Sequence, residues 1–226
     1  MAIGVVGVAA AGGLLYAARR YYRNWGTTKE ECQMTLPGDE LIPRPAVQST
    51  EGIWIDAPPR AIWPWLVQIG QDRAGIYSHE MLENLVGLDY HTADRIHPEW
   101  QRLEVGDRIR LAPDGWMGMR RGLTLTVAQV VEGEHIVLRG APPDFPWDAV
   151  WSFHLVLRWE DRCRLLLRTR ARLRYPGEAL VTELTGPVVS VLTRGMLLGI
   201  KRRVESPQGD SGGPPVGEPA AEDFHI

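Results

Sequence analysis

Residues 150–174 read VWSFHLVLRWEDRCRLLLRTRARLR, and this stretch indicates the fold. In its second half Leu165 and Leu167 fall on one side of an extended chain, and arginines fall on the other. The first half places Trp151 and Phe153 on a common side in the same way. A period of two with one polar side is typical of antiparallel strands. We therefore predict two antiparallel strands that share an apolar face.

The same criteria, applied outward from this stretch, predict further strands and three helices. A strand at residues 52–56 ends before Pro58 and Pro59, and proline is favoured in the first turn of the helix that follows. The other predicted strands cover residues 105–111, 123–131 and 135–139. The predicted helices cover residues 59–69, 79–86 and 182–204.

This order of elements gives an α+β fold in which a curved antiparallel sheet wraps around a long C-terminal helix. The apolar strand faces would then line an interior between the sheet and that helix. Gln129 and Thr169 are polar positions on these apolar faces, so each could orient a ligand or bond to a neighbouring backbone group. His154 falls on the opposite side of its strand and should point away from the interior. The residues predicted to line the ligand site are Val127, Gln129, Trp151, Phe153, Leu155, Leu167, Thr169, Leu192 and Met196.

The order of elements and the stretch IWIDAPPRAIWPWL at 53–66 resemble the START and polyketide-cyclase-like superfamily, also called SRPBCC or Bet v 1-like. The resemblance covers residues 25–204 and implies a helix-grip fold with an internal cavity. Shorter stretches resemble an uncharacterised actinobacterial-type branch with an N-terminal membrane anchor: WG at 25–26, LPGDE at 36–40, WLVQIGQ at 65–71, LENL at 82–85, ADRI at 93–96 and PEWQ at 98–101. The superfamily includes lipid carriers, hormone receptors, cyclases and hydroxylase domains, so the resemblance does not imply one function.

Residues 1–25 differ in composition from the rest of the chain. The first 18 residues carry no charged side chain, and Arg19, Arg20 and Arg23 follow without any acid. About 20 apolar residues span a bilayer as a helix, with a lower limit near 17. Because the arginines follow the apolar run, the positive-inside rule places the body on the cytoplasmic side. We predict a single-pass anchor in the cell membrane; the alternatives are a cleaved signal peptide and a helix packed on the body.

The remaining regions are a body, residues 26–204, and a tail, residues 205–226. The tail carries five acids and no Lys or Arg among many Gly and Pro residues, which predicts a disordered acidic tail. The formal net charge of -3 excludes a strongly basic nucleic-acid-binding protein. We expect the arginines of 162–174 to form a solvated outer face, with contact to anionic lipid headgroups as a weaker option.

The sequence contains no nucleophile elbow, Gly-x-Gly-x-x-Gly loop or strong metal motif, so we expect no cofactor and no metal. The H-x-x-D-x-x-H pattern at 91–97 is too loosely spaced to indicate a metal site. The leading hypothesis is a membrane-tethered domain that binds a hydrophobic or lipid-like small molecule. The alternatives are a cyclase- or hydrolase-type enzyme, with Tyr77, Glu83 or Asp94 as the inward polar group, and a partner-binding scaffold with a filled core.

Overall fold

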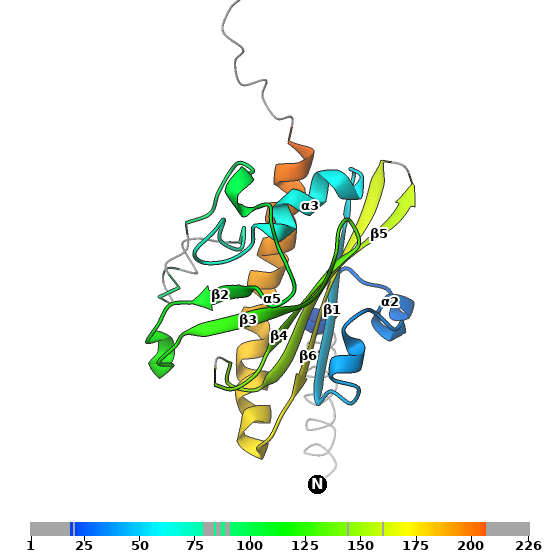
Figure 1. Cartoon of the computed structure of the whole chain (residues 1–226). Coiled ribbons are helices and arrows are strands. Elements are labelled where there is room, and N and C mark those ends of the chain that lie inside the picture. The colour runs from blue at the N-terminus through cyan, green and yellow to red at the C-terminus, as the bar shows by residue number, and fades with distance from the viewer. Residues whose placement is uncertain are drawn as a thin grey trace, which may run out of the picture.

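The computed structural model describes residues 19, 21–78, 84, 87–88, 91–143, 145–159 and 161–206. One antiparallel sheet runs through the molecule, and its strands stand in the order β1-β6-β5-β4-β3-β2 (Figure 1). The strands are β1 (Val47–Ile55), β2 (Arg108–Ala112), β3 (Leu123–Val131), β4 (His135–Gly140), β5 (Asp148–Trp159) and β6 (Arg162–Arg172). The helices are α2 (Lys29–Gln33), α3 (Pro59–Val67) and α5 (Pro176–Glu205), with 3₁₀ turns η1 (Asp39–Leu41), η2 (Pro98–Trp100) and η3 (Trp116–Gly118).

A six-stranded antiparallel sheet with a long C-terminal helix against one face fits a helix-grip fold. The predicted strand pair is confirmed, and Leu165 and Leu167 lie in the core. The structure extends β1 five residues before the predicted start at Gly52. Helix α5 begins six residues before its predicted start, because Pro176 occupies its first turn and Glu178 completes a capping box there. The predicted helix 79–86 lies largely outside the described residues, as do residues 1–18 and 207–226.

Helix α5 runs in the same direction as β1. The Lys201 ammonium donates to the backbone oxygen of Trp54 at 2.7 Å, and Glu205 accepts from the backbone N–H of Asp56 at 2.7 Å. Gly199 lies directly against the backbone of Tyr77, where a Cβ atom would collide with the carbonyl oxygen. The second half of α5 is therefore fixed closely against the rest of the core.

A segment of residues 24–46, which we call the strap, passes from α5 over the edge of the sheet to its other face. Along this edge the backbone N–H of Gly52 donates to Trp25 O at 3.0 Å, and the Thr27 hydroxyl donates to Thr50 O at 2.9 Å. Exposed edge strands invite pairing with other chains, so the strap protects β1. Beyond the edge, α2 and η1 cover the face of the sheet that is turned away from α5 (Figure 1).

Candidate functional site

The residues between the sheet and α5 are fully buried at one end and only partly buried at the other, and we call these the closed end and the open end. At the closed end Met196, Leu197 and Ile200 of α5 are buried in one cluster with Ile55 and Leu165. Each of these five side chains is exposed by 1% or less. This end is filled by side chains and has no room for a guest.

The open end lies toward the N-terminal half of α5. Thr169 pairs with Ser49 on β1 and with Trp151 on β5, and all three residues are only half-buried. The Trp151 ring lies 4.9 Å from that of Phe153, measured between centroids. Leu192 of α5 is half-buried as well. This end therefore presents an aromatic and apolar wall that water reaches in part.

Glu51 is a carboxylic acid on this apolar inner face. It pairs with Leu167 in the sheet, and its side chain is 3% exposed. Its Oε2 atom is buried and has no hydrogen-bond partner. Burial raises the pKa of Glu51 to about 8, against the opposing effects of the Ser190 hydroxyl and the Arg194 charge. The group is therefore protonated at neutral pH, and a neutral carboxyl can both donate and accept a hydrogen bond.

Two polar side chains of α5 face the Glu51 carboxyl group from across the interior. The Ser190 hydroxyl donates to the backbone oxygen of Tyr22 at 2.6 Å. The Arg194 guanidinium lies 4.7 Å from the ring centroid of Trp25, and its buried Nε atom has no hydrogen-bond partner. Buried polar atoms are normally paired in folded proteins, so unpaired ones on both facing elements mark a place where a ligand or water can bind.

The structure places most of the predicted lining residues between the sheet and α5. They divide by exposure, with Trp151, Thr169 and Leu192 half-buried at the open end. The fully buried members are Val127, Phe153, Leu155, Leu167 and Met196. Whether any of them contacts a ligand stays a prediction.

The predicted inward orientation of Gln129 is wrong. The register of β3 shifts between Val127 and Gln129, and this bulge reverses the alternation. Gln129 consequently pairs with Val137 on the opposite face, where its amide donates to the Glu40 carboxylate. It cannot serve as a polar group in the interior.

The three acid–base candidates from the sequence are not brought together. Tyr77 is fully buried, and its hydroxyl donates to Trp65 O at 3.0 Å, so that hydroxyl is already engaged. Burial raises the pKa of Tyr77 above its ordinary range. Asp94 is exposed on the surface, and Glu83 lies outside the described residues. Among the described residues no three His, Cys, Asp or Glu side chains gather in a way that could hold a metal ion.

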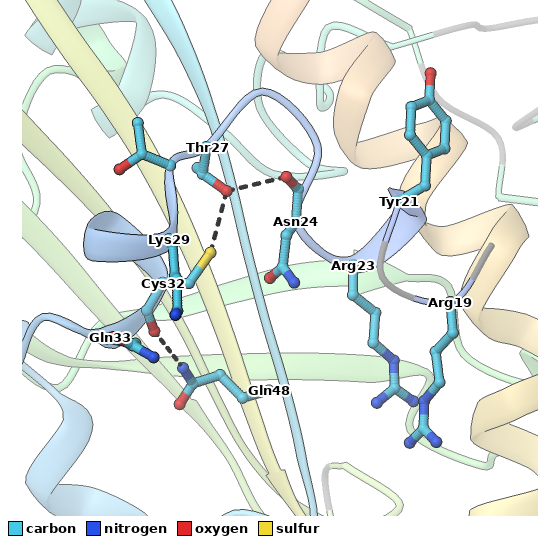
Figure 2. Close-up of a pocket in the computed structure, with 10 residues that line it drawn as sticks. Arg19, Tyr21, Arg23, Asn24, Thr27, Lys29, Cys32, Gln33 and Gln48 are labelled. Atoms are coloured by element: carbon cyan, nitrogen blue, oxygen red, sulfur yellow. Dashed lines mark hydrogen bonds between the residues drawn. The ribbon is translucent and has the colours of Figure 1, made fainter. Parts of the chain in front are cut away.

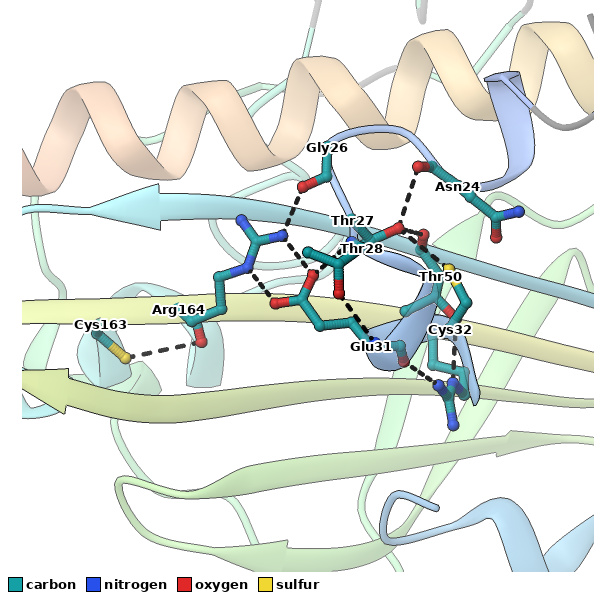
Figure 3. Close-up of polar contacts among 10 residues, drawn as sticks. Asn24, Gly26, Thr27, Thr28, Glu31, Cys32, Thr50, Cys163 and Arg164 are labelled. Carbon is teal, nitrogen blue, oxygen red and sulfur yellow. Dashed lines mark hydrogen bonds and ion pairs between the residues drawn. The ribbon is translucent and has the colours of Figure 1, made fainter. Parts of the chain in front are cut away.

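The expected solvated arginine face is wrong for three of its members, Arg164, Arg168 and Arg170, because the strap covers them. Arg164 is 2% exposed and holds Glu31 through two parallel bonds, Nε–Oε1 and Nη2–Oε2, each 2.8 Å long (Figure 3). Arg168 is 1% exposed and donates to Asp39 Oδ2 and to the backbone oxygen of Met34, both at 2.7 Å. Charges are buried only when they are paired, and here each arginine finds its partner on the strap.

The ion pair with Arg164 keeps the Glu31 carboxylate charged. Burial raises the pKa of Glu31, but the bonds from Arg164 and from the Thr28 N–H outweigh it, so the pKa lies below its ordinary value. His154 points away from the interior, as predicted, and is buried beneath the strap with Ser152 Oγ at 2.9 Å. Burial, with His135 and Arg168 nearby, lowers the pKa of His154 to about 3. This face is a structural clamp.

Sequence reasoning missed Glu51 because it began the strand at Gly52. Extending the alternation back by one residue places Glu51 on the same face as Ile53 and Ile55, so the signal was present. Ser190 and Arg194 were missed because the apolar run of α5 does not show which side meets β1. The strap was missed because no local pattern pairs Glu31 with an arginine 133 residues away.

Comparison with known proteins adds little beyond the fold. No protein-family model matches this chain, and no curated protein matches it. A solution structure from Thermobifida fusca is similar at 14% identity and a TM-score of 0.45, covering 70% of this chain and 92% of the other. Norcoclaurine synthase from Thalictrum flavum is similar at 14% identity and a TM-score of 0.40, covering 72% and 95%. An HSP90 activator from Plasmodium falciparum is similar at 13% identity and a TM-score of 0.41, covering 69% of this chain and 94% of the other. Such low values carry no inference about function.

The predicted membrane anchor falls outside the part of the chain that the structure describes. Within the described ranges, no helix combines the length and the apolar character needed to cross a bilayer.

Proposed function

We propose that this chain is a membrane-tethered domain that binds a hydrophobic or lipid-like small molecule at the open end of the interior. The buried, unpaired carboxyl oxygen of Glu51 on an otherwise apolar face is the observation that carries this proposal. An unpaired buried polar group costs roughly 1–3 kcal/mol, and a ligand that pairs with it recovers that cost. Residues 1–18 would supply the tether, as their uncharged composition suggests.

The open end suits a ligand with a long apolar part and one uncharged polar group. The wall around Trp151 and Leu192 offers apolar surface, and burial of a ligand there is worth roughly 25 cal/mol per Å² before the costs of association. The polar group would meet Glu51, which is protonated at neutral pH. A ligand hydroxyl or carbonyl fits a neutral carboxyl without burying a charge.

The test is to identify what the full chain carries when it is purified in a mild detergent. Native mass spectrometry should show a bound small molecule that solvent extraction releases. Replacing Trp151 by Ala should lower its occupancy, because the ring forms the wall of the open end. Trp159→Ala is the matched control, since this second tryptophan of β5 is 61% exposed and lies outside the interior. Equal occupancy in both variants, or no bound molecule in any preparation, would contradict the proposal.

Acid–base catalysis in the same place is a second candidate, and Glu51 is the specific observation that favours it. A carboxyl group with a pKa near 8 can transfer protons at neutral pH. This candidate requires that the copurified molecule change mass on incubation with the wild-type chain. It also requires that Glu51→Gln, which keeps the shape of the side chain, stop that change. A molecule recovered unaltered leaves binding as the function.

A further inference from the structure

The strap and the helical residues 21–23 enclose a groove that the interior site does not use. The groove has a volume of 660 Å³ and is separate from the open end. Figure 2 shows Arg19 and Arg23 along one wall and Lys29, Gln33 and Gln48 along the other. Its lining residues are Arg19, Tyr21, Arg23, Asn24, Thr27, Thr28, Lys29, Cys32, Gln33 and Gln48.

The described residues that form the wall of this groove are rich in hydrogen-bond donors, and none of them is acidic. Arg19 and Arg23 share one carboxylate, Glu183 of α5, at 2.9 and 2.7 Å, and that carboxylate is not part of the wall. Three cations against this one carboxylate leave two positive charges at the groove. A concave surface with that charge and with amide donors suits an anion with several acceptor oxygens.

The contacts with Glu183 also hold the arginines in place. The Arg23 side chain is mostly buried, while Arg19 remains half-exposed beside it. The Tyr22 hydroxyl donates to the same carboxylate at 3.1 Å. The guanidinium groups are therefore fixed before any ligand arrives, which lowers the entropy that binding costs.

We propose that this groove binds a phosphate-bearing group, and that the source of this group is the headgroup of an anionic lipid. The lipid source rests on the proposed tether, because residue 19 directly follows the uncharged segment 1–18 and chain connectivity keeps the groove close to a membrane in which that segment sits. An exposed aromatic side chain belongs to the groove: Tyr21 is one of its lining residues and is 65% exposed. Aromatic and apolar groups beside basic ones are typical of surfaces at the headgroup level.

The experiment uses the full chain in nonionic detergent micelles with equal amounts of phosphatidylglycerol and phosphatidylcholine. Native mass spectrometry counts the lipids that stay bound. We expect retention of phosphatidylglycerol over phosphatidylcholine. In the double variant Arg19→Gln/Lys29→Gln that preference should fall roughly 25-fold, because each cation near a lipid surface contributes about fivefold. The charge-matched control is Arg60→Gln/Arg202→Gln, which removes two exposed cations elsewhere and should change nothing.

A second variant keeps the test independent of the ion pairs. Gln33→Glu places a negative charge in the groove without removing a cation, and it should lower phosphatidylglycerol retention as well. Millimolar inorganic phosphate distinguishes the two sources of the phosphate group. One outcome keeps the phosphate site but gives the phosphate group a soluble source. In that outcome the wild type binds phosphate, both groove variants lose this binding, and the wild type shows no lipid preference. Equal lipid retention and equal phosphate binding in wild type, groove variants and control would overturn the proposal. The ligand of the interior is unaffected by these variants, so its loss or retention tests the proposed function separately.

Discussion

Replacing Glu51 by Gln should make the protein more stable at alkaline pH, and the gain should grow with pH. The folded state holds the pKa of Glu51 at about 8, whereas the ordinary value in the unfolded chain is 4.5. Between these two values the folded state binds more protons than the unfolded state, so the wild-type free energy of unfolding falls as pH rises. Gln cannot ionise and keeps nearly the same shape, so the variant lacks this contribution.

The size of the effect follows from the two pKa values. A rise from 4.5 to about 8 is worth at most about 5 kcal/mol, since each pKa step is worth about 1.4 kcal/mol. By the same linkage relation, roughly 3–4 kcal/mol of this stability difference develops between pH 5 and pH 8. The stability difference between Glu51→Gln and wild type should therefore be small at pH 5 and should level off above pH 8.

The assay is urea unfolding of the full chain in detergent micelles, followed by tryptophan fluorescence at a series of pH values. Taking the difference between variant and wild type removes the pH dependence of all other groups, including that of His154. Glu132→Gln serves as the control, because this carboxylate is exposed in the turn between β3 and β4. Parallel stability curves for Glu51→Gln and wild type would show that the Glu51 carboxyl is not buried on the inner face, and the reasoning about the interior would fail with it.

Three further predictions test the packing of the fold. Gly199→Ala should lower the free energy of unfolding by at least about 2 kcal/mol, because the new Cβ would collide with a neighbouring backbone carbonyl. The control Gly177→Ala, whose new Cβ lies in open space, should not destabilise the fold, and equal unfolding midpoints for the two variants would contradict this. Arg168→Ala should lower the free energy of unfolding by about 3–5 kcal/mol, because it leaves a buried carboxylate with weaker pairing. Arg172→Ala removes an exposed side chain and should change that free energy by no more than about 0.5 kcal/mol; a small loss for both variants would refute the clamp. Burial raises the pKa of Cys163 to about 11, so iodoacetamide at pH 8 should alkylate only the other cysteine of the folded chain; rapid alkylation of both would place Cys163 at the surface.

The orientation of the central strands could be predicted from the sequence because it depends on local alternation. Leu165 and Leu167 face the core because every second residue of a strand points to the same side. The same rule placed His154 on the opposite face, and the sequence carries no sign of burial there. One bulge in β3 was enough to turn Gln129 outward, and no residue type in that stretch announces a bulge.

The partners of the arginines could not be predicted, because they come from a distant segment. Arg164 and Arg168 look like solvated residues when their strand is considered alone, since Arg is rarely buried without a partner. Their partners Glu31 and Asp39 lie in a stretch with only short helical turns, and its position against the sheet follows from the tertiary structure. Glu51 lay within reach of the alternation rule, but the predicted strand began one residue later, at Gly52.

The most direct measurement of the central claim is photolabelling of the full chain with a long-chain alcohol that carries a diazirine, followed by peptide mapping. The probe has the apolar tail and the uncharged hydroxyl that the open end and Glu51 should accept. We expect label on β5 around Trp151, on β6 around Thr169 and on α5 around Leu192, and unlabelled alcohol should compete for it. Label confined to the exposed face of α5, or no label that competes, would contradict binding between the sheet and the helix.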